Sequence, residues 1–103
     1  MSKNKTIHEL TNILAKALRH KIGSIVNPDE IYANKYAKDA DVLLKEAKKI
    51  ALKENWNIYD KPKIKEELKR KLKIELQNKD FLNERKFDIM EEEMNKVLKL
   101  FGL

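Results

Sequence analysis

The chain has 103 residues, of which 42% are hydrophobic and 39% are charged, and its formal net charge is +6. This length corresponds to about one ordinary domain, and two glycines and two prolines are too few for the tight turns of a small β-sandwich or barrel. The absence of cysteine excludes disulfides, thiolate metal sites and cysteine nucleophiles. We therefore expect one helical domain over residues 1–103, stabilised by the packing of apolar side chains.

The sequence also predicts where the protein resides. No apolar stretch of signal-peptide length follows the N-terminus, and nowhere do about 18 apolar residues run together. We therefore expect a soluble, cytoplasmic protein with no membrane contact.

The first predicted helix begins at Thr6. Thr6 and Glu9 have the spacing of a capping box, in which the two side chains satisfy free amides at a helix start. Apolar residues then recur every three or four positions as far as Ile25, as they do in a helix with one buried face. Asn27 and Pro28 combine a capping side chain with a proline suited to the first helical position, so the chain should turn there.

The second predicted helix covers 28–54, a range without a helix breaker. A helix of this length spans about 40 Å, which predicts an elongated bundle. Along one face, small or apolar residues recur at spacings of three and four: Ala33, Ala37, Ala40, Leu44, Ala47 and Ala51. Such a seam predicts that a neighbouring helix packs closely, at roughly the short end of the usual 8–10 Å separation.

Two more helices complete the predicted fold. A helix over 62–77 begins at Pro62 and carries an apolar residue at every fourth position. A final helix begins near Asp80 or Asn83 and ends with Gly102 as its C-terminal cap. Its acidic run, 91–93, should complement the basic first or third helix. The predicted fold is therefore all-α: an elongated, mostly antiparallel four-helix bundle with a long central second helix.

Basic residues concentrate in the third predicted helix. The candidates for contact with nucleic-acid phosphates are Lys61, Lys63, Lys65, Lys69, Arg70 and Lys73. Four of these lysines follow one another at a spacing of four, which places them along roughly one face. Of 23 basic residues in the chain, only Arg19, Arg70 and Arg85 are arginine, so base-specific recognition is weakly supported. The competing interpretation is a solvated helix face whose field is lowered by Glu66 and Glu67.

Two aromatic residues precede this basic cluster. Trp56 and Tyr59 lie beside lysines and could stack on unpaired bases. The competing interpretation, which we favour for the tryptophan, is that Trp56 and Ile58 close one end of the bundle.

The sequence offers no constellation for catalysis or metal binding. His8 and His20 lie about 120° apart around the first helix, so they cannot share a metal ion. There is no glycine-flanked serine and no glycine-rich phosphate loop. We therefore expect no enzyme activity, no metal site and no cofactor.

Two functional hypotheses follow. The first is a small, basic, non-enzymatic protein that binds RNA or DNA through the six basic residues of the third helix, with Trp56 and Tyr59 stacking on bases. The second is an assembly module, either a homodimer or a subunit bound to a protein partner. Its interface would be the part of the apolar seam that the core of the domain does not cover.

Overall fold

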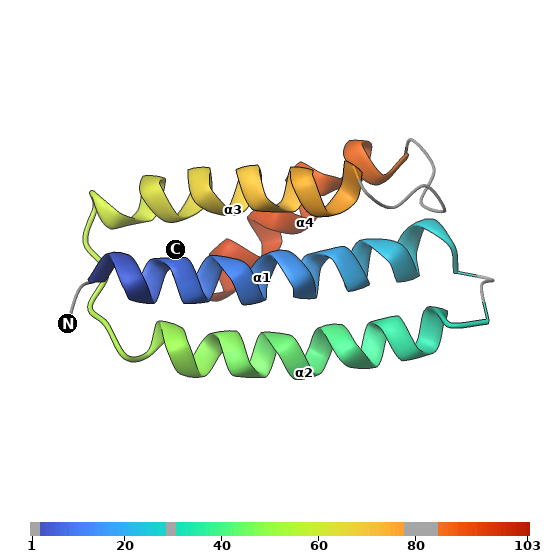
Figure 1. Ribbon diagram of the computed structural model, residues 1–103, viewed down its shortest axis with the longest axis horizontal. Helices are drawn as coiled ribbons and strands as arrows, with labels where there is room; N and C mark the ends of the chain where they lie inside the picture. The colour runs from blue at the N-terminus through green and yellow to red at the C-terminus, as the bar shows by residue number, and fades with distance from the viewer. Residues whose placement is uncertain (1–2, 29–30, 78–84) are drawn as a thin grey trace.

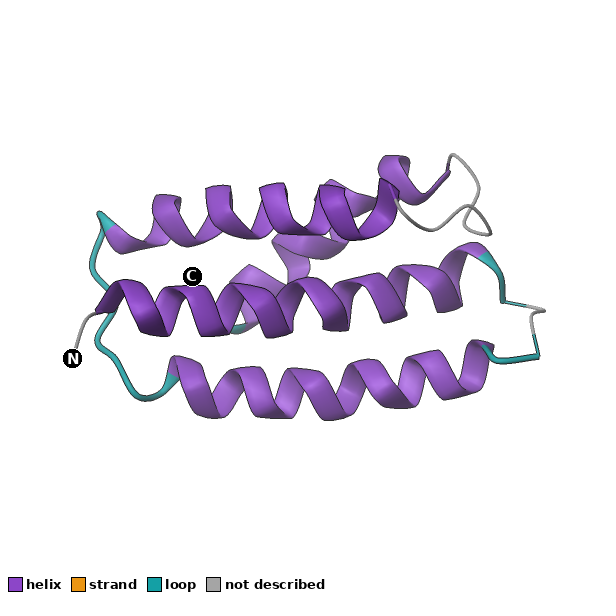
Figure 2. Ribbon diagram, viewed as in Figure 1, coloured by secondary structure: helices purple, strands orange, loops and turns teal. Residues whose placement is uncertain are grey.

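The computed structural model describes residues 3–28, 31–77 and 85–103. Within these ranges the chain forms helices and no strand (Figures 1 and 2). The helices are α1 (Lys3–Val26), α2 (Ala33–Ala51), α3 (Asp60–Gln77) and α4 (Arg85–Leu100). This confirms the predicted all-α fold of four helices.

The helices are arranged around α1. Figure 1 shows α2 and α3 on opposite sides of α1, with α4 crossing obliquely behind. Contacts from Asn4 to Lys63 and from Arg19 to Glu75 show that α1 and α3 run parallel, whereas α2 and α4 run the other way. The molecule is elongated, with extents of 42 × 22 × 20 Å. In the described residues, the α2 backbone packs against no helix other than α1.

The second helix is shorter than predicted, and it is not the central one. Within the range 28–54, which is predicted as one helix, α2 comprises 19 residues. The longer helix is α1, which has 24 residues and occupies the centre of the bundle. At the N-terminal end, Tyr32 precedes the helix without a side-chain capping bond. At the other end, Leu52 and Lys53 turn out of the helix. A sequence range without helix breakers gives only the maximum length of a helix, and tertiary packing decides how much of that range becomes helical.

The predicted start of the first helix is also wrong. Thr6 lies inside α1 and is buried, and its hydroxyl donates a hydrogen bond of 3.3 Å to Glu54. The helix begins at Lys3, whose ammonium group donates to the Asp60 carboxylate and to the Asn55 carbonyl, each at 2.8 Å. Contacts with the α2–α3 connector therefore hold the first turn, and they replace the predicted capping box.

The predicted C-terminal cap is confirmed. Gly102 has φ +73°, a conformation that favours glycine. The Leu103 amide donates to the Leu98 carbonyl at 2.8 Å, and the Gly102 amide donates to the Lys99 carbonyl at 3.1 Å, which together form a Schellman motif. The start predicted for this helix, near Asp80 or Asn83, lies outside the described residues.

The core lies chiefly between α1 and α3. Its fully buried large side chains are Leu10, Leu14, Leu18, Ile22, Ile64, Leu68, Leu72, Leu76 and Met94. The alanine seam of α2 packs beside this core, but not all of its members are covered. Ala40 and Ala47 are buried, whereas Ala37 is exposed and Leu44 is half-buried. The seam is thus wider than the part that α1 covers.

Candidate nucleic-acid interface

Lysines occur at every fourth residue of α3 from Lys61 to Lys73, and Glu91 of α4 lies against this row. The Lys69 ammonium group forms an ion pair with the Glu91 carboxylate. A hydrogen bond from Lys69, together with the charges of Lys65 and Lys73, holds the pKa of Glu91 below its usual value. The predicted complementarity between the last helix and the basic third helix is therefore present.

Three lysines of this row remain available. Lys61, Lys65 and Lys73 are exposed, and none of their side chains forms a hydrogen bond or ion pair with another residue in 3–28, 31–77 or 85–103. With a rise of 1.5 Å per residue, the first and last are about 18 Å apart along the helix. We call these three residues the free lysine row. At 100° per residue the row winds around α3, so its positive charge is spread over about 120° of the helix surface.

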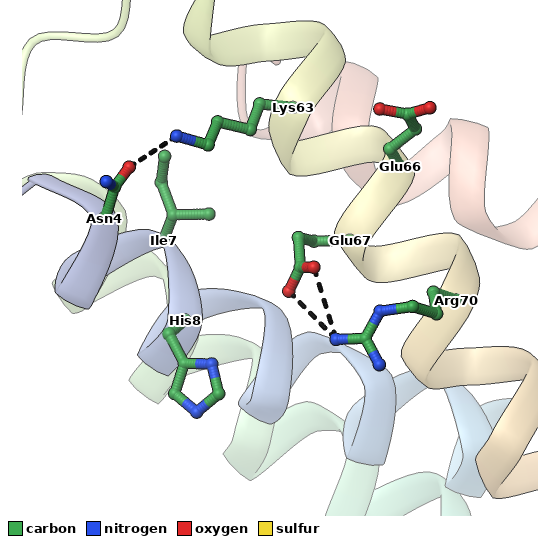
Figure 3. A pocket seen from close by; sticks show the side chains of 7 residues that line it. All are labelled: Asn4, Ile7, His8, Lys63, Glu66, Glu67 and Arg70. Carbon is green, nitrogen blue, oxygen red and sulfur yellow. Dashed lines mark hydrogen bonds and ion pairs between the residues drawn. The ribbon is translucent and has the colours of Figure 1, made fainter.

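Lys63 and Arg70 do not belong to this row. They line a pocket of about 570 Å³ between the first turns of α1 and α3, shown in Figure 3 together with Asn4 and Glu67. Arg70 donates to both carboxylate oxygens of Glu67 at 3.2 Å. Lys63 donates to the Asn4 side-chain oxygen at 2.5 Å. Because Lys63 and Arg70 each bind another residue of the pocket, the structure divides the predicted basic cluster into a paired part and a free part.

A seventh basic residue of α3, Lys71, is buried in the interface with α1. Its ammonium group donates to the Thr11 hydroxyl at 2.7 Å and to the His8 carbonyl at 3.1 Å. Burial lowers the pKa of Lys71, and the nearby Glu67 carboxylate only partly opposes this effect. The sequence shows Lys71 as one more lysine in a dense cluster, and only its position on the side of α3 that faces α1 distinguishes it. Its role is to join two helices.

The two aromatic candidates have different surroundings. Trp56 is half-buried against the core, and its indole N–H donates to the Ala51 carbonyl at 2.9 Å. Tyr59 is 80% exposed, one residue before α3 begins. Trp56 therefore closes the end of the bundle, as the competing interpretation has it, but Ile58, which is 73% exposed, does not take part. Of the two, Tyr59 is the side chain open to a ligand.

The histidines belong to helix packing. The Nδ1–H group of His20 donates a 2.7 Å hydrogen bond to the Lys16 carbonyl, and the His20 ring meets the Tyr36 ring edge-on. Throughout the described ranges, no group of three His, Asp or Glu side chains is arranged to hold a metal ion. None of the helices in those ranges combines the length and the apolar character that a membrane span requires.

Comparison with known proteins gives no family for this chain. No family model matches it, and no curated protein or solved structure matches it significantly. Any proposal about its function therefore depends on the geometry described above.

Proposed function

We propose that this protein is a non-enzymatic nucleic-acid-binding protein that contacts phosphates through the free lysine row of α3. The observation that carries the proposal is the exposure of Lys61, Lys65 and Lys73 beside an exposed Tyr59. The side chains of these lysines form no hydrogen bond or ion pair with the described residues, although the charges of Lys65 and Lys73 act on Glu91. Lysines in such a row displace counterions condensed on a nucleic acid, and this release favours binding whatever the base sequence.

Tyr59 favours a single-stranded ligand. An exposed aromatic ring next to lysines can stack on an unpaired base, whereas the bases of a duplex are stacked on one another. The scarcity of arginine on α3, where Arg70 is bound to Glu67, argues against recognition of particular base pairs. The proposed ligand is therefore single-stranded RNA or DNA, bound with little sequence preference.

Titration of labelled oligonucleotides tests this proposal. Single-stranded and duplex RNA and DNA are added to the protein at about 50 and 200 mM salt, and fluorescence anisotropy reports binding. We expect single strands to bind more tightly than duplexes, with an affinity that falls as salt increases. The triple variant Lys61→Glu, Lys65→Glu, Lys73→Glu should abolish binding, and Tyr59→Ala should weaken it by about tenfold or more.

A matched control separates a local contact from the effect of net charge. The triple variant Lys35→Glu, Lys38→Glu, Lys53→Glu makes the same charge change at exposed lysines in and after α2, and we expect it to retain most of the affinity. The proposal is wrong if no oligonucleotide binds at low salt. It is also wrong if the two triple variants lose affinity equally, because binding would then depend on overall charge and not on α3.

A further inference from the structure

One face of α2 has no helix backbone packed closely against it in the described part of the chain, and only the end of α4 lies beside it. It carries Ala37, Asp41, Leu44, Lys45, Lys48 and Leu52. All but Lys45, which adjoins Leu44, repeat at spacings of three and four, so they lie on one side, next to the side that packs on α1. Leu52 caps the end of the helix and keeps a helical backbone conformation, so it continues this side. We call these six residues the open face of α2.

The open face borders an apolar groove between α2 and the end of α4. Two adjoining hollows, of about 240 and 260 Å³, are both lined by Lys48, Leu100 and Phe101. On the two walls, Leu52 is 77% exposed and Leu100 is 75% exposed. Leucines so exposed on both sides of one groove are typical of a surface that a partner covers.

Two oppositely charged residues of the open face, Asp41 and Lys48, are arranged about one midpoint, at which Leu44 and Lys45 lie. The two Lys45 residues would meet near this midpoint whichever way a second α2 runs. Asp41 and Lys48 stand two turns apart, on either side of a midpoint between positions 44 and 45. The small Ala37 and the large Leu52 lie farther out, at equal distances from the same midpoint. In the part of the chain that the structure describes, neither Asp41 nor Lys48 forms an ion pair.

We propose that the open face binds the open face of a second copy of this chain, with the two α2 helices antiparallel. A two-fold axis through the midpoint places Asp41 of each copy opposite Lys48 of the other, and Ala37 opposite Leu52. Both ion pairs are attractive in this arrangement. In a parallel arrangement, Asp41 would lie beside Asp41 and Lys48 beside Lys48, and these like charges repel. The contact does not involve the free lysine row, so the proposal is independent of nucleic-acid binding.

Sedimentation of the full chain, without nucleic acid, tests the proposal. Over about 1–500 µM protein, we expect the mass to rise from that of the 12.2-kDa chain to twice that value. Asp41→Lys creates two Lys–Lys contacts, and Lys48→Asp creates two Asp–Asp contacts. Each variant should therefore dimerise about tenfold or more weakly. Glu46→Lys and Lys35→Asp make the same charge changes on other sides of α2 and should leave dimerisation unchanged.

Mixing the Asp41→Lys variant with the Lys48→Asp variant gives the decisive measurement. In the mixed pair, the two introduced side chains, a lysine and an aspartate, face each other, and the natural Lys48 of the first chain faces the natural Asp41 of the second. Both ion pairs are therefore attractive again, and we expect a heterodimer with nearly the affinity of the natural homodimer.

Three outcomes overturn the proposal. The first is a monomer at every concentration. The second is a dimer that the single variants do not weaken, and the third is a mixture in which dimerisation is not restored, because the face or its orientation would then be wrong.

Discussion

The two sides of α1 are built differently. On the α3 side, α1 contributes large leucines and also polar contacts, including Lys71 with Thr11 and Arg19 with Glu75. On the α2 side, it meets buried alanines, such as Ala47, which is 0% exposed. Small side chains let two helices approach closely over a long distance, whereas buried polar groups demand one particular alignment.

The comparison indicates what each side contributes to the fold. On the α3 side, the polar contacts fix the position of α3 along α1, because a shift of either helix would leave a buried ammonium group without its acceptors. On the α2 side, the buried alanines allow close packing of α2 on α1, and an atom added to one of these side chains has little room.

The largest effect is expected from enlarging a covered alanine of α2. Ala47→Leu adds a branched side chain where α2 meets the core and should lower the free energy of unfolding by about 1–3 kcal/mol. Urea unfolding followed by Trp56 fluorescence measures the change. At the exposed Ala37, in the same predicted seam, the substitution Ala37→Leu should change the stability by less than about 0.5 kcal/mol. Equal losses at both positions would contradict the difference between the covered and open parts of the seam.

Apolar periodicity was sufficient to predict the number and order of the helices. The spacing of Leu68 and Leu72 on α3, and of Met90 and Met94 on α4, follows the period of a helix, and all four side chains are buried. The glycine cap at Gly102 was also predictable, since it depends on only a few neighbouring residues. The limits of α2 were not, because they depend on how much of the helix α1 covers.

The candidate site was only partly predictable. The density of lysine on α3 is visible in the sequence, but the sequence does not show that Lys69 meets Glu91 or that Lys71 points toward α1. Both facts depend on which side of α3 each neighbouring helix occupies. Helical spacing places residues relative to one another around one axis, and it leaves open which neighbouring helix each side meets.

A smaller effect is expected on the α3 side, where Thr11→Val removes one acceptor of the buried Lys71 ammonium group. Because the buried ammonium group then loses one acceptor and keeps the His8 carbonyl as another, the free energy of unfolding should fall by about 1 kcal/mol. The double variant Thr11→Val, Lys71→Met removes both polar groups and should recover most of this loss. Thermal and urea unfolding of the wild type, both single variants and the double variant give the coupling between the two residues. Losses that simply add would show that the contact contributes nothing to the alignment of α1 with α3.

The smallest effect is expected at α4, the third neighbour of α1. It is a change in how the free energy of unfolding depends on pH. Glu93 is buried. Lys96 donates a hydrogen bond of 3.0 Å to its Oε2, and the Lys21 ammonium group of α1 forms an ion pair with its Oε1 at 3.1 Å. Burial raises the pKa of Glu93, but the hydrogen bonds and charges of Lys96 and Lys21 outweigh this effect and hold the pKa below the usual 4.5. The folded state therefore binds a proton less readily at this carboxylate than the unfolded state does.

Because the folded pKa is the lower one, this carboxylate stabilises the protein above the unfolded value and ceases to do so as the pH falls through the folded value. Glu93→Gln, which cannot titrate, should therefore lose less stability than the wild type between about pH 6 and pH 3, as urea unfolding at each pH would show. The matched variant Glu92→Gln removes the same charge at an exposed side chain and should retain the wild-type dependence. If Glu93→Gln also retained it, the ion pair of α4 with Lys21 would not contribute to stability, and α1 would be aligned by its contacts with α3 alone.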